Sequence, residues 1–303
     1  MLHYLVGGGQ KLTLKNKIKM ISSTNQIDSS AKIHPNVVMG EYNRIGKNVV
    51  IEILGDKNAS VNIGDNNIIN DNTRIFVHGK LEIGDWNVFH NDMLMMAETE
   101  MKIGHNCWFG QNTILDAAGG LEMGNGVRVG MYSQIWTHVA SGEQIEGCTL
   151  YSKRKTTIED DVWLVGSCVV GSGLHLGKRS IALINSVLTK DTEPNRVYAG
   201  SPAKLIEKAN FYNEVTLQDK LNMLNVWLDE YVTSNPSISM TKSEDETVLT
   251  ENADKMVFTI KSEKTDAKGT FFLVDKTFNK SNSELERKVY KFLYNNKARF
   301  IPN

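Results

Sequence analysis

The sequence predicts a mainly β fold: a parallel β-helix of six-residue repeats, followed by a small α+β appendage. Apolar residues recur every six positions over much of the chain, and glycine often follows them. This period is lost after Ile206, where a different pattern begins. Internal periods of this kind are typical of architectures that stack one structural unit on the next.

Five apolar-glycine pairs set the frame of the repeat. They follow one another at steps of 18, 20, 20 and 20 residues, at Ile45-Gly46, Ile63-Gly64, Ile83-Gly84, Ile103-Gly104 and Met123-Gly124. Further apolar residues lie six and twelve positions after each of the last four, as Phe109 and Leu115 follow Ile103. Such spacing indicates a chain that turns a corner every six residues, because a helix repeats every 3.6 residues and a strand every two. We therefore expect triangular coils with parallel strands and inward anchors.

The regular spacing is interrupted once. Ile135 and Ile158 should be six residues apart but are separated by 23, so a loop of about 17 extra residues leaves one corner. The loop runs roughly from Val139 to Thr156, and His138 immediately precedes it. We therefore expect this histidine at the mouth of a cleft that the loop bounds.

After Ile206 the sequence predicts a separate domain, which divides the chain into a β-helix domain (1–208) and a C-terminal domain (209–303). Leucines at helical spacing predict a helix within residues 211–233. A polar linker is expected over 234–254, followed by strands over 256–260 and 270–274 and a helix over 283–294. The pattern of this domain suggests no function.

Composition excludes several partner classes. The formal net charge of −1 provides no field that would attract nucleic acid or an anionic membrane. No apolar run is long enough to cross a bilayer, and the first residues lack the order of a signal peptide. The three cysteines, Cys107, Cys148 and Cys168, fit no zinc or CxxC spacing. These features predict a cytoplasmic protein with reduced thiols.

Sequence blocks within residues 157–206 carry a family resemblance. They read DVW, SVLTKD and YAGSPAKLI, and the triplet WTH ending at His138 precedes them. They resemble the signature of hexapeptide-repeat acyltransferases, in particular the maltose, galactoside and polysaccharide O-acetyltransferases, over roughly residues 20–208. The chain departs from that pattern in having no second histidine soon after His138, and in having Leu183, Ile184 and Asn185 where small residues are usual.

The resemblance implies a left-handed β-helix and acetyl-CoA as co-substrate, with no metal. It also implies a homotrimer with active sites between subunits, and a sugar acceptor such as a bacterial surface polysaccharide or its precursor. A flat face bearing Trp86, Trp108 and Trp163 is the expected subunit interface, since exposed aromatic residues at that density would be sticky.

Acetyl transfer to an alcohol needs a base for the hydroxyl proton and donors for the oxyanion. Histidine, with an ordinary pKa of about 6.5, suits the base, so His138 is the expected catalytic residue. Glu143 in the loop is the candidate carboxylate for orienting the imidazole, although a solvated loop acid explains it equally well. Asp116 and Trp136 are candidates for the acceptor site, although a corner Asx turn explains Asp116 better.

Further roles come from the resemblance alone. It places Trp163 in the acetyl and acceptor pocket, and Gly166 and Ile184 along the pantetheine arm of CoA. Thr189, Lys190 and Lys204 match positions that contact the distal part of CoA, where cations suit phosphates. The run Lys153–Lys155 could hold an acidic group or be a solvated part of the loop.

Other functions stay open at this point. N-acetylation of an amino sugar or nucleotide sugar, and serine O-acetylation, use the same scaffold. A zinc enzyme of the γ-carbonic anhydrase type needs three histidines, but Ser180 stands where the third is expected beside His138 and His175. A catalytically inactive scaffold would have lost its base, whereas His138 is present.

Overall fold

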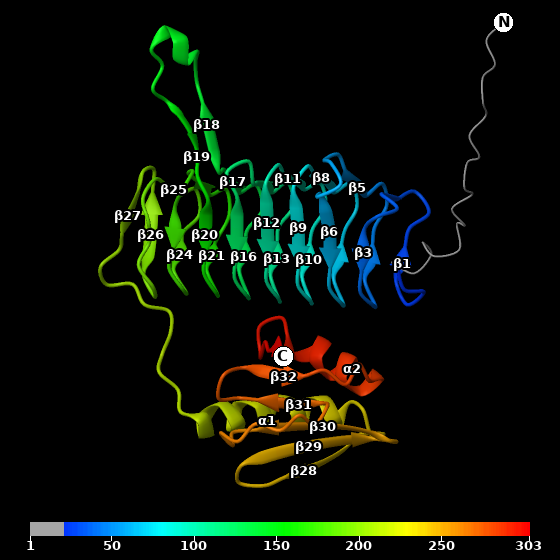
Figure 1. The fold of residues 1–303 in the computed structure, drawn as a ribbon. Coiled ribbons are helices and arrows are strands. Elements are labelled where there is room, and N and C mark those ends of the chain that lie inside the picture. The colour runs from blue at the N-terminus through cyan, green and yellow to red at the C-terminus, as the bar shows by residue number, and fades with distance from the viewer. Residues whose placement is uncertain (1–20) are drawn as a thin grey trace, which may run out of the picture.

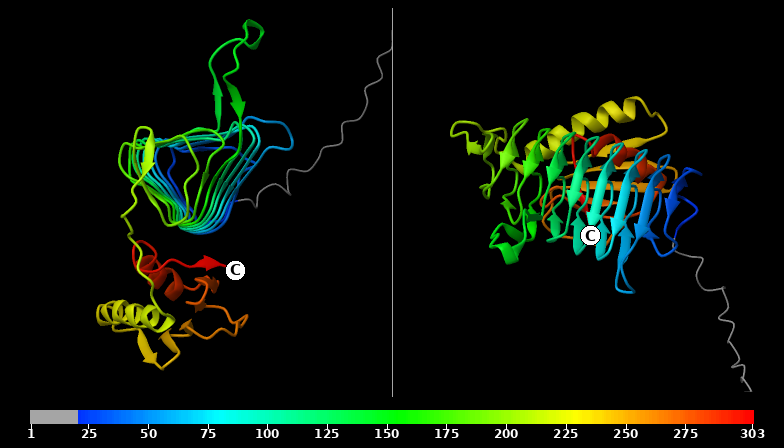
Figure 2. Two further views of the ribbon diagram at one scale, coloured as in Figure 1. Left: turned by 90° about the vertical axis from the view of Figure 1, so that its left-hand side faces the viewer. Right: turned by 90° about the horizontal axis from the view of Figure 1, so that it is seen from above.

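The computed structural model describes residues 21–303, and the start of the predicted first domain, including the segment read for a signal peptide, lies outside the described residues. The predicted fold class is confirmed: the chain forms a left-handed parallel β-helix with a small α+β part beside it (Figure 1). Viewed along its axis, the β-helix is triangular (Figure 2). Among the described residues, no helix is both long and apolar enough to span a bilayer.

Three sheets form the faces of the triangle. The first contains β1 (Gln26–Ile27), β4 (Arg44–Ile45), β7 (Ile68–Ile69), β10 (Val88–Phe89), β13 (Trp108–Phe109), β16 (Arg128–Val129), β21 (Trp163–Leu164), β24 (Ile181–Ala182), β26 (Val197–Gly200) and β27 (Ala203–Leu205). The second contains β2 (Lys32–Ile33), β5 (Val50–Ile53), β8 (Arg74–Val77), β11 (Leu94–Ala97), β14 (Ile114–Asp116), β17 (Gln134–Ile135), β22 (Val169–Val170) and β25 (Val187–Leu188). The third contains β3 (Val38–Met39), β6 (Ser60–Ile63), β9 (Lys80–Ile83), β12 (Glu100–Ile103), β15 (Leu121–Met123), β20 (Thr156–Ile158) and β23 (His175–Leu176).

The predicted anchors form the core of the β-helix. Ile103 pairs with Ile83 on one side and Met123 on the other, all on the third sheet, and all three side chains are buried. The rings of Phe89 and Phe109 stack with their centroids 4.9 Å apart inside the first sheet. Each coil thus buries one apolar side chain per face against its neighbours, as the six-residue period requires.

Asparagines fix the corner between the third and first sheets. The Asn43 side-chain oxygen accepts the Asn67 backbone N–H, and the Asn67 oxygen accepts that of Asn87, at 2.7 and 2.8 Å. The Asn87 oxygen accepts the N–H of Cys107 at 2.7 Å. Buried backbone donors at a corner have no sheet partner, and this ladder supplies one from the coil before.

The interruption in the repeat is a hairpin that projects from one corner (Figure 2). It leaves between the second and third sheets and consists of β18 (His138–Ala140), a 3₁₀ turn (Gln144–Glu146) and the antiparallel β19 (Tyr151–Lys153). Lys153 pairs with Glu98 at 3.0 Å, and Lys155 pairs with Glu122. Two of the three cations in the run 153–155 therefore tie the base of the loop to preceding coils.

The C-terminal domain folds around its own sheet. Its elements are α1 (Leu217–Thr233), β28 (Ser239–Lys242), β29 (Glu246–Glu251), β30 (Asp254–Thr259), β31 (Thr270–Phe272), β32 (Thr277–Asn279), α2 (Glu284–Leu293) and β33 (Ile301–Pro302). The predicted polar linker over 234–254 is wrong, because this segment contains β28 and β29 of the six-stranded sheet. β29 buries Thr247 and Leu249 on one face. This alternation of buried and less buried residues is hard to recognise in the sequence, because most residues of the strand are polar.

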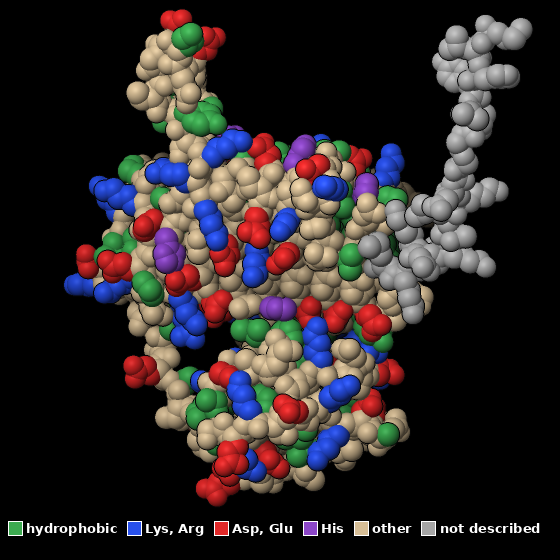
Figure 3. Space-filling view, in the orientation of Figure 1, with side chains coloured by type: hydrophobic (Ala, Val, Ile, Leu, Met, Phe, Trp, Pro, Cys, Tyr) green, Lys and Arg blue, Asp and Glu red, His purple; other side chains and the backbone are tan. Residues whose placement is uncertain are grey.

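The C-terminal domain packs against the corner of the β-helix opposite to the hairpin (Figure 1). Trp86, at that corner, is 8% exposed and lies edge-on to Tyr290 of α2 with ring centroids 4.8 Å apart. The Tyr290 hydroxyl donates to Asn106 at 2.8 Å, and Lys280 pairs with both Asp65 and Asp85. On the face shown in Figure 3, basic and acidic side chains are interspersed over both domains.

This packing corrects the predicted subunit interface. Trp86 is covered by the chain's own C-terminal domain, so it is not part of a face left for another subunit. Trp108 is half-buried, and Trp163 is 44% exposed on the first sheet. Of the three tryptophans, Trp163 is thus the most accessible.

We expect Trp86→Ala to lower the free energy of unfolding by about 3 kcal/mol, because it leaves a cavity between the two domains. Urea unfolding, followed by fluorescence and circular dichroism, would measure the change. Phe211→Ala is the matched control, since that ring is 63% exposed and its loss should change stability by less than about 0.5 kcal/mol. Equal losses in the two variants would contradict the role assigned to Trp86.

Candidate active site

The hairpin corner brings an imidazole and a carboxylate together. His138 is the first residue of β18, and Asp116 is the last residue of β14, one coil earlier. The Nδ1 atom of His138 lies 2.9 Å from Oδ2 of Asp116. The side chain of His138 is 36% exposed, whereas that of Asp116 is 2% exposed. A buried acid therefore holds a half-exposed histidine.

Asp116 is fixed by further contacts. Its Oδ2 also accepts the backbone N–H and the side-chain hydroxyl of Thr137, both at 2.9 Å. The Thr137 hydroxyl in turn accepts the N–H of Gly119 at 2.8 Å. A carboxylate only accepts hydrogen bonds, so the hydrogen of the imidazole lies on Nδ1 and the lone pair on Nε2. This is the tautomer that a general base needs.

Backbone contacts hold the same corner from the other side. The Thr137 carbonyl accepts the Arg154 N–H at 3.0 Å and the Ser172 hydroxyl at 2.8 Å. The guanidinium of Arg154 donates to the carbonyl of Ser172 at 3.1 Å. The position of His138 is therefore set by three successive coils and by the hairpin.

His138 lines a surface depression of about 730 Å³. Trp136, Thr189 and Lys190 share its wall, together with Arg154 and Asp191. The ring of Trp136 stands edge-on to that of His138, with centroids 6.1 Å apart. Four of the residues selected from the sequence thus surround one depression.

The structure corrects the carboxylate assignments. Asp116, and not Glu143, is the acid that bonds His138; Glu143 is exposed in the hairpin, next to its 3₁₀ turn. Asp116 is also not placed to bind an acceptor, because it is buried and its Oδ2 already accepts three hydrogen bonds. The sequence contained a signal for this pairing. Asp116 stands one coil before Trp136, and Trp136 lies two residues before His138.

The other selected residues lie away from this depression. Trp163 is on β21 of the first sheet, and Gly166 follows it at the corner leading to the second sheet. Ile184 is 63% exposed at the same corner one coil later, where Asn185 donates its N–H to the Gly166 carbonyl at 3.0 Å. Lys204 is on β27 at the end of the β-helix. A single chain does not bring these four residues to His138.

The histidines considered for zinc have separate partners. His175 Nε2 lies 2.8 Å from Glu159, whereas His138 faces Asp116. Within residues 21–303, no group of three His, Cys, Asp or Glu side chains is arranged to hold a metal ion.

Comparison with known proteins gives partial matches. No family model matches the chain. It is 28% identical to a galactoside O-acetyltransferase of Lactococcus lactis over 119 residues, which are 39% of this chain and 48% of that protein. It is 33% identical to a probable macrolide acetyltransferase of Lysinibacillus sphaericus over 86 residues, which are 28% of this chain and 47% of that one. The resemblance to acetyltransferases is confirmed. The chain spans about half the length of these curated relatives.

Two solved structures with a similar fold are also acetyltransferases. One is a polysialic acid O-acetyltransferase, 17% identical, covering 63% of this chain and 88% of that one with a TM-score of 0.36. The other is a hexapeptide-repeat acetyltransferase from Vibrio cholerae in complex with acetyl-CoA, 18% identical, covering 57% and 70% with a TM-score of 0.31.

Proposed function

We propose that this chain transfers the acetyl group of acetyl-CoA to a hydroxyl of a sugar, such as a unit of a bacterial surface polysaccharide or its precursor. The observation that carries the proposal is the pair of His138 and buried Asp116, 2.9 Å apart at the wall of a depression. The partial identity to O-acetyltransferases supports the type of reaction.

The chemistry follows from the tautomer. Nε2 of His138 takes the proton of the acceptor hydroxyl while its oxygen attacks the thioester carbonyl. The tetrahedral intermediate collapses, the carbon–sulfur bond breaks, and the CoA thiolate leaves with the proton from the imidazolium. Asp116 stabilises the imidazolium between these two transfers, and Thr137 keeps the carboxylate in place. Acetyl-CoA is the co-substrate, and the reaction needs no metal.

Thr189 and Lys190 share the wall of the depression with His138, which supports a role in binding CoA. Trp163, Gly166, Ile184 and Lys204 complete the proposed site only if a second copy of the chain contributes. Trp163 and Ile184 are large apolar side chains that are 44% and 63% exposed, and contact with another copy would cover them. We therefore propose a homotrimer with its active sites between subunits.

Lys190→Ala should raise the KM for acetyl-CoA about tenfold and change kcat little, because the ammonium group contributes a charge-assisted contact to CoA. Initial rates at varied acetyl-CoA concentration would measure this. Lys57→Ala, an exposed lysine in a corner loop near the start of the β-helix, is the control and should leave KM unchanged. A KM effect confined to the sugar would refute the assignment of Lys190 to CoA.

Release of CoA thiol from acetyl-CoA, measured with a panel of neutral, acidic and amino sugars, tests the function. We expect turnover with a sugar and an alkali-labile ester in the product. A stable amide formed only with amino sugars would overturn O-acetylation in favour of N-acetylation. Absence of turnover with every sugar class would contradict the proposal as a whole.

A further inference from the structure

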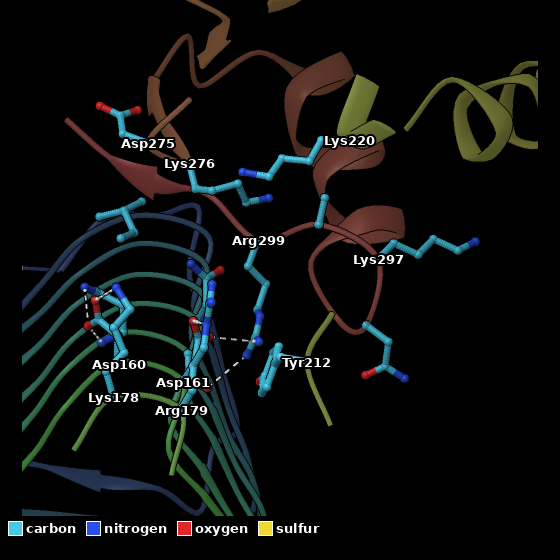
Figure 4. Close-up of a pocket in the computed structure, with 16 residues that line it drawn as sticks. Asp160, Asp161, Lys178, Arg179, Tyr212, Lys220, Asp275, Lys276, Lys297 and Arg299 are labelled. Atoms are coloured by element: carbon cyan, nitrogen blue, oxygen red, sulfur yellow. Dashed lines mark hydrogen bonds and ion pairs between the residues drawn. The ribbon is translucent and has the colours of Figure 1, made fainter. Parts of the chain in front are cut away.

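A second hollow lies between the β-helix and the C-terminal domain (Figure 4). Its volume is about 350 Å³, and both domains line it. Lys178 and Arg179 come from the β-helix and Lys220 from α1. Lys276 comes from the turn between β31 and β32, and Arg299 from the segment before β33. It lies on the side of the β-helix away from the hairpin, so it is separate from the depression at His138.

The lining of this interdomain cavity is strongly basic. Six cationic side chains face three acidic ones. Each acid already has a partner: Asp161 pairs with Arg299 at 3.0 Å, Asp160 with Lys178 at 3.6 Å, and Asp275 with Lys264. The positive charge of the cavity is therefore only partly balanced by its own acids.

Lys220 and Lys276 carry the positive charge of the cavity that its acidic side chains do not balance. Neither has an ion-pair partner within 4.0 Å among residues 21–303, and their side chains point into the same space (Figure 4). The ammonium group of Lys276 lies 3.9 Å from the centre of the Phe300 ring. Two cations that share a hollow repel each other, and a bound anion would remove that repulsion.

The backbone conformation and the charge state of Lys276 are both unusual for a lysine. The residue follows β31 in a turn with φ of +62°, a conformation that favours Gly or Asn. Burial, and then the charges of Arg299 and Lys220, lower the pKa of Lys276 to about 7, while Asp161 opposes the shift. The charge of Lys276 is buried beside two other cations, as is typical of groups at functional sites.

We propose that the interdomain cavity binds a small molecule through its phosphate group, held by Lys220, Lys276 and Arg299. A phosphate dianion balances the two lysine charges, and its tetrahedral oxygens accept hydrogen bonds from several directions. Tyr212 lines the same cavity, with the Arg179 guanidinium 5.0 Å from its ring centre, and offers an aromatic surface to the rest of the ligand. The three cationic residues that hold the phosphate belong to the C-terminal domain, and Lys178 and Arg179 of the β-helix line the opposite side of the cavity, so a bound molecule would contact both domains.

Inorganic pyrophosphate is the probe that tests this site. Calorimetric titration of the full chain at constant ionic strength should show saturable binding, accompanied by a rise in the melting temperature. At pH 8 binding should take up protons, because an adjacent anion raises the pKa of Lys276. Heats measured in two buffers of different ionisation enthalpy would give that uptake.

Lys276→Gln and Lys220→Gln should each weaken pyrophosphate binding about tenfold or more, since each removes a charge-assisted contact. Lys268→Gln, in an exposed turn of the same domain, is the control and should bind as the wild type does. Equal affinity in the wild type and Lys276→Gln, no saturable binding, or tighter binding of citrate than of pyrophosphate would overturn the proposal. These outcomes do not depend on acetyl transfer, so they are independent of the proposed function.

Discussion

His138→Ala is expected to lower the rate of acetyl transfer by two to four powers of ten, because it removes the proposed general base. The loss should fall on kcat, since the imidazole acts on the hydroxyl proton and contributes little to holding CoA. The β-helix should stay folded: His138 stands at a corner, 36% exposed, and does not belong to the core. Single-turnover rates and circular dichroism would check both expectations.

His175→Ala is the matched control. This histidine is also on the β-helix and also bonds a carboxylate, with Nε2 2.8 Å from Glu159. It is 56% exposed and is not among the residues that line the depression around His138. We expect its loss to leave turnover within about twofold of wild type, as for surface changes away from a site. If the two variants lost activity alike, the effect at His138 would be structural and the assigned base wrong.

The sequence predicts the β-helix well because the apolar residues of its core follow one simple rule of spacing. Each anchor, such as Ile103 or Phe109, is buried by residues at fixed separations of about 20 positions, so the period alone determines the register. The position of His138 follows from the same rule, since it is counted from Ile135 and the break in spacing.

Contacts that depend on three-dimensional packing are not contained in that rule. Glu143 is closer to His138 in sequence than Asp116 is, but the hairpin carries it away, whereas stacking brings Asp116 to 2.9 Å. Trp86 reads as an outward residue of a coil, and its cover comes from α2, some 200 residues later. The interdomain cavity likewise joins residues that no spacing relates.

The contacts at the hairpin corner suit it to the proposed role of holding a base. A loop of this length, leaving a regular stack, would by itself let its first residue vary in position. Here Lys153 and Glu98 pair at the base of the hairpin, and Arg154 binds the Ser172 carbonyl. These contacts and the Asp116 hydrogen bonds restrict the imidazole to one orientation, which is what general-base catalysis needs.

Asp116→Asn should lower kcat by about one to two powers of ten, with KM for both substrates little changed. An amide oxygen in the place of Oδ2 can still accept from the Thr137 N–H, the Thr137 hydroxyl and Nδ1 of His138, so the tautomer and the fold are kept. What is lost is the negative charge that stabilises the imidazolium during the reaction. Asp116→Ala should in addition destabilise the fold by about 1–3 kcal/mol, because it leaves buried donors without an acceptor.

A double-mutant cycle separates this positioning role from a purely structural one. If Asp116 acts through the imidazole, Asp116→Asn should cost nothing further in the His138→Ala background, although it costs one to two powers of ten in the wild type. Steady-state rates of the four proteins with one sugar acceptor and acetyl-CoA would give the coupling. The same fractional loss in both backgrounds would mean that Asp116 shapes the corner independently of His138. Full coupling would show that the carboxylate and the imidazole act as one unit, as their 2.9 Å contact and the burial of Asp116 imply.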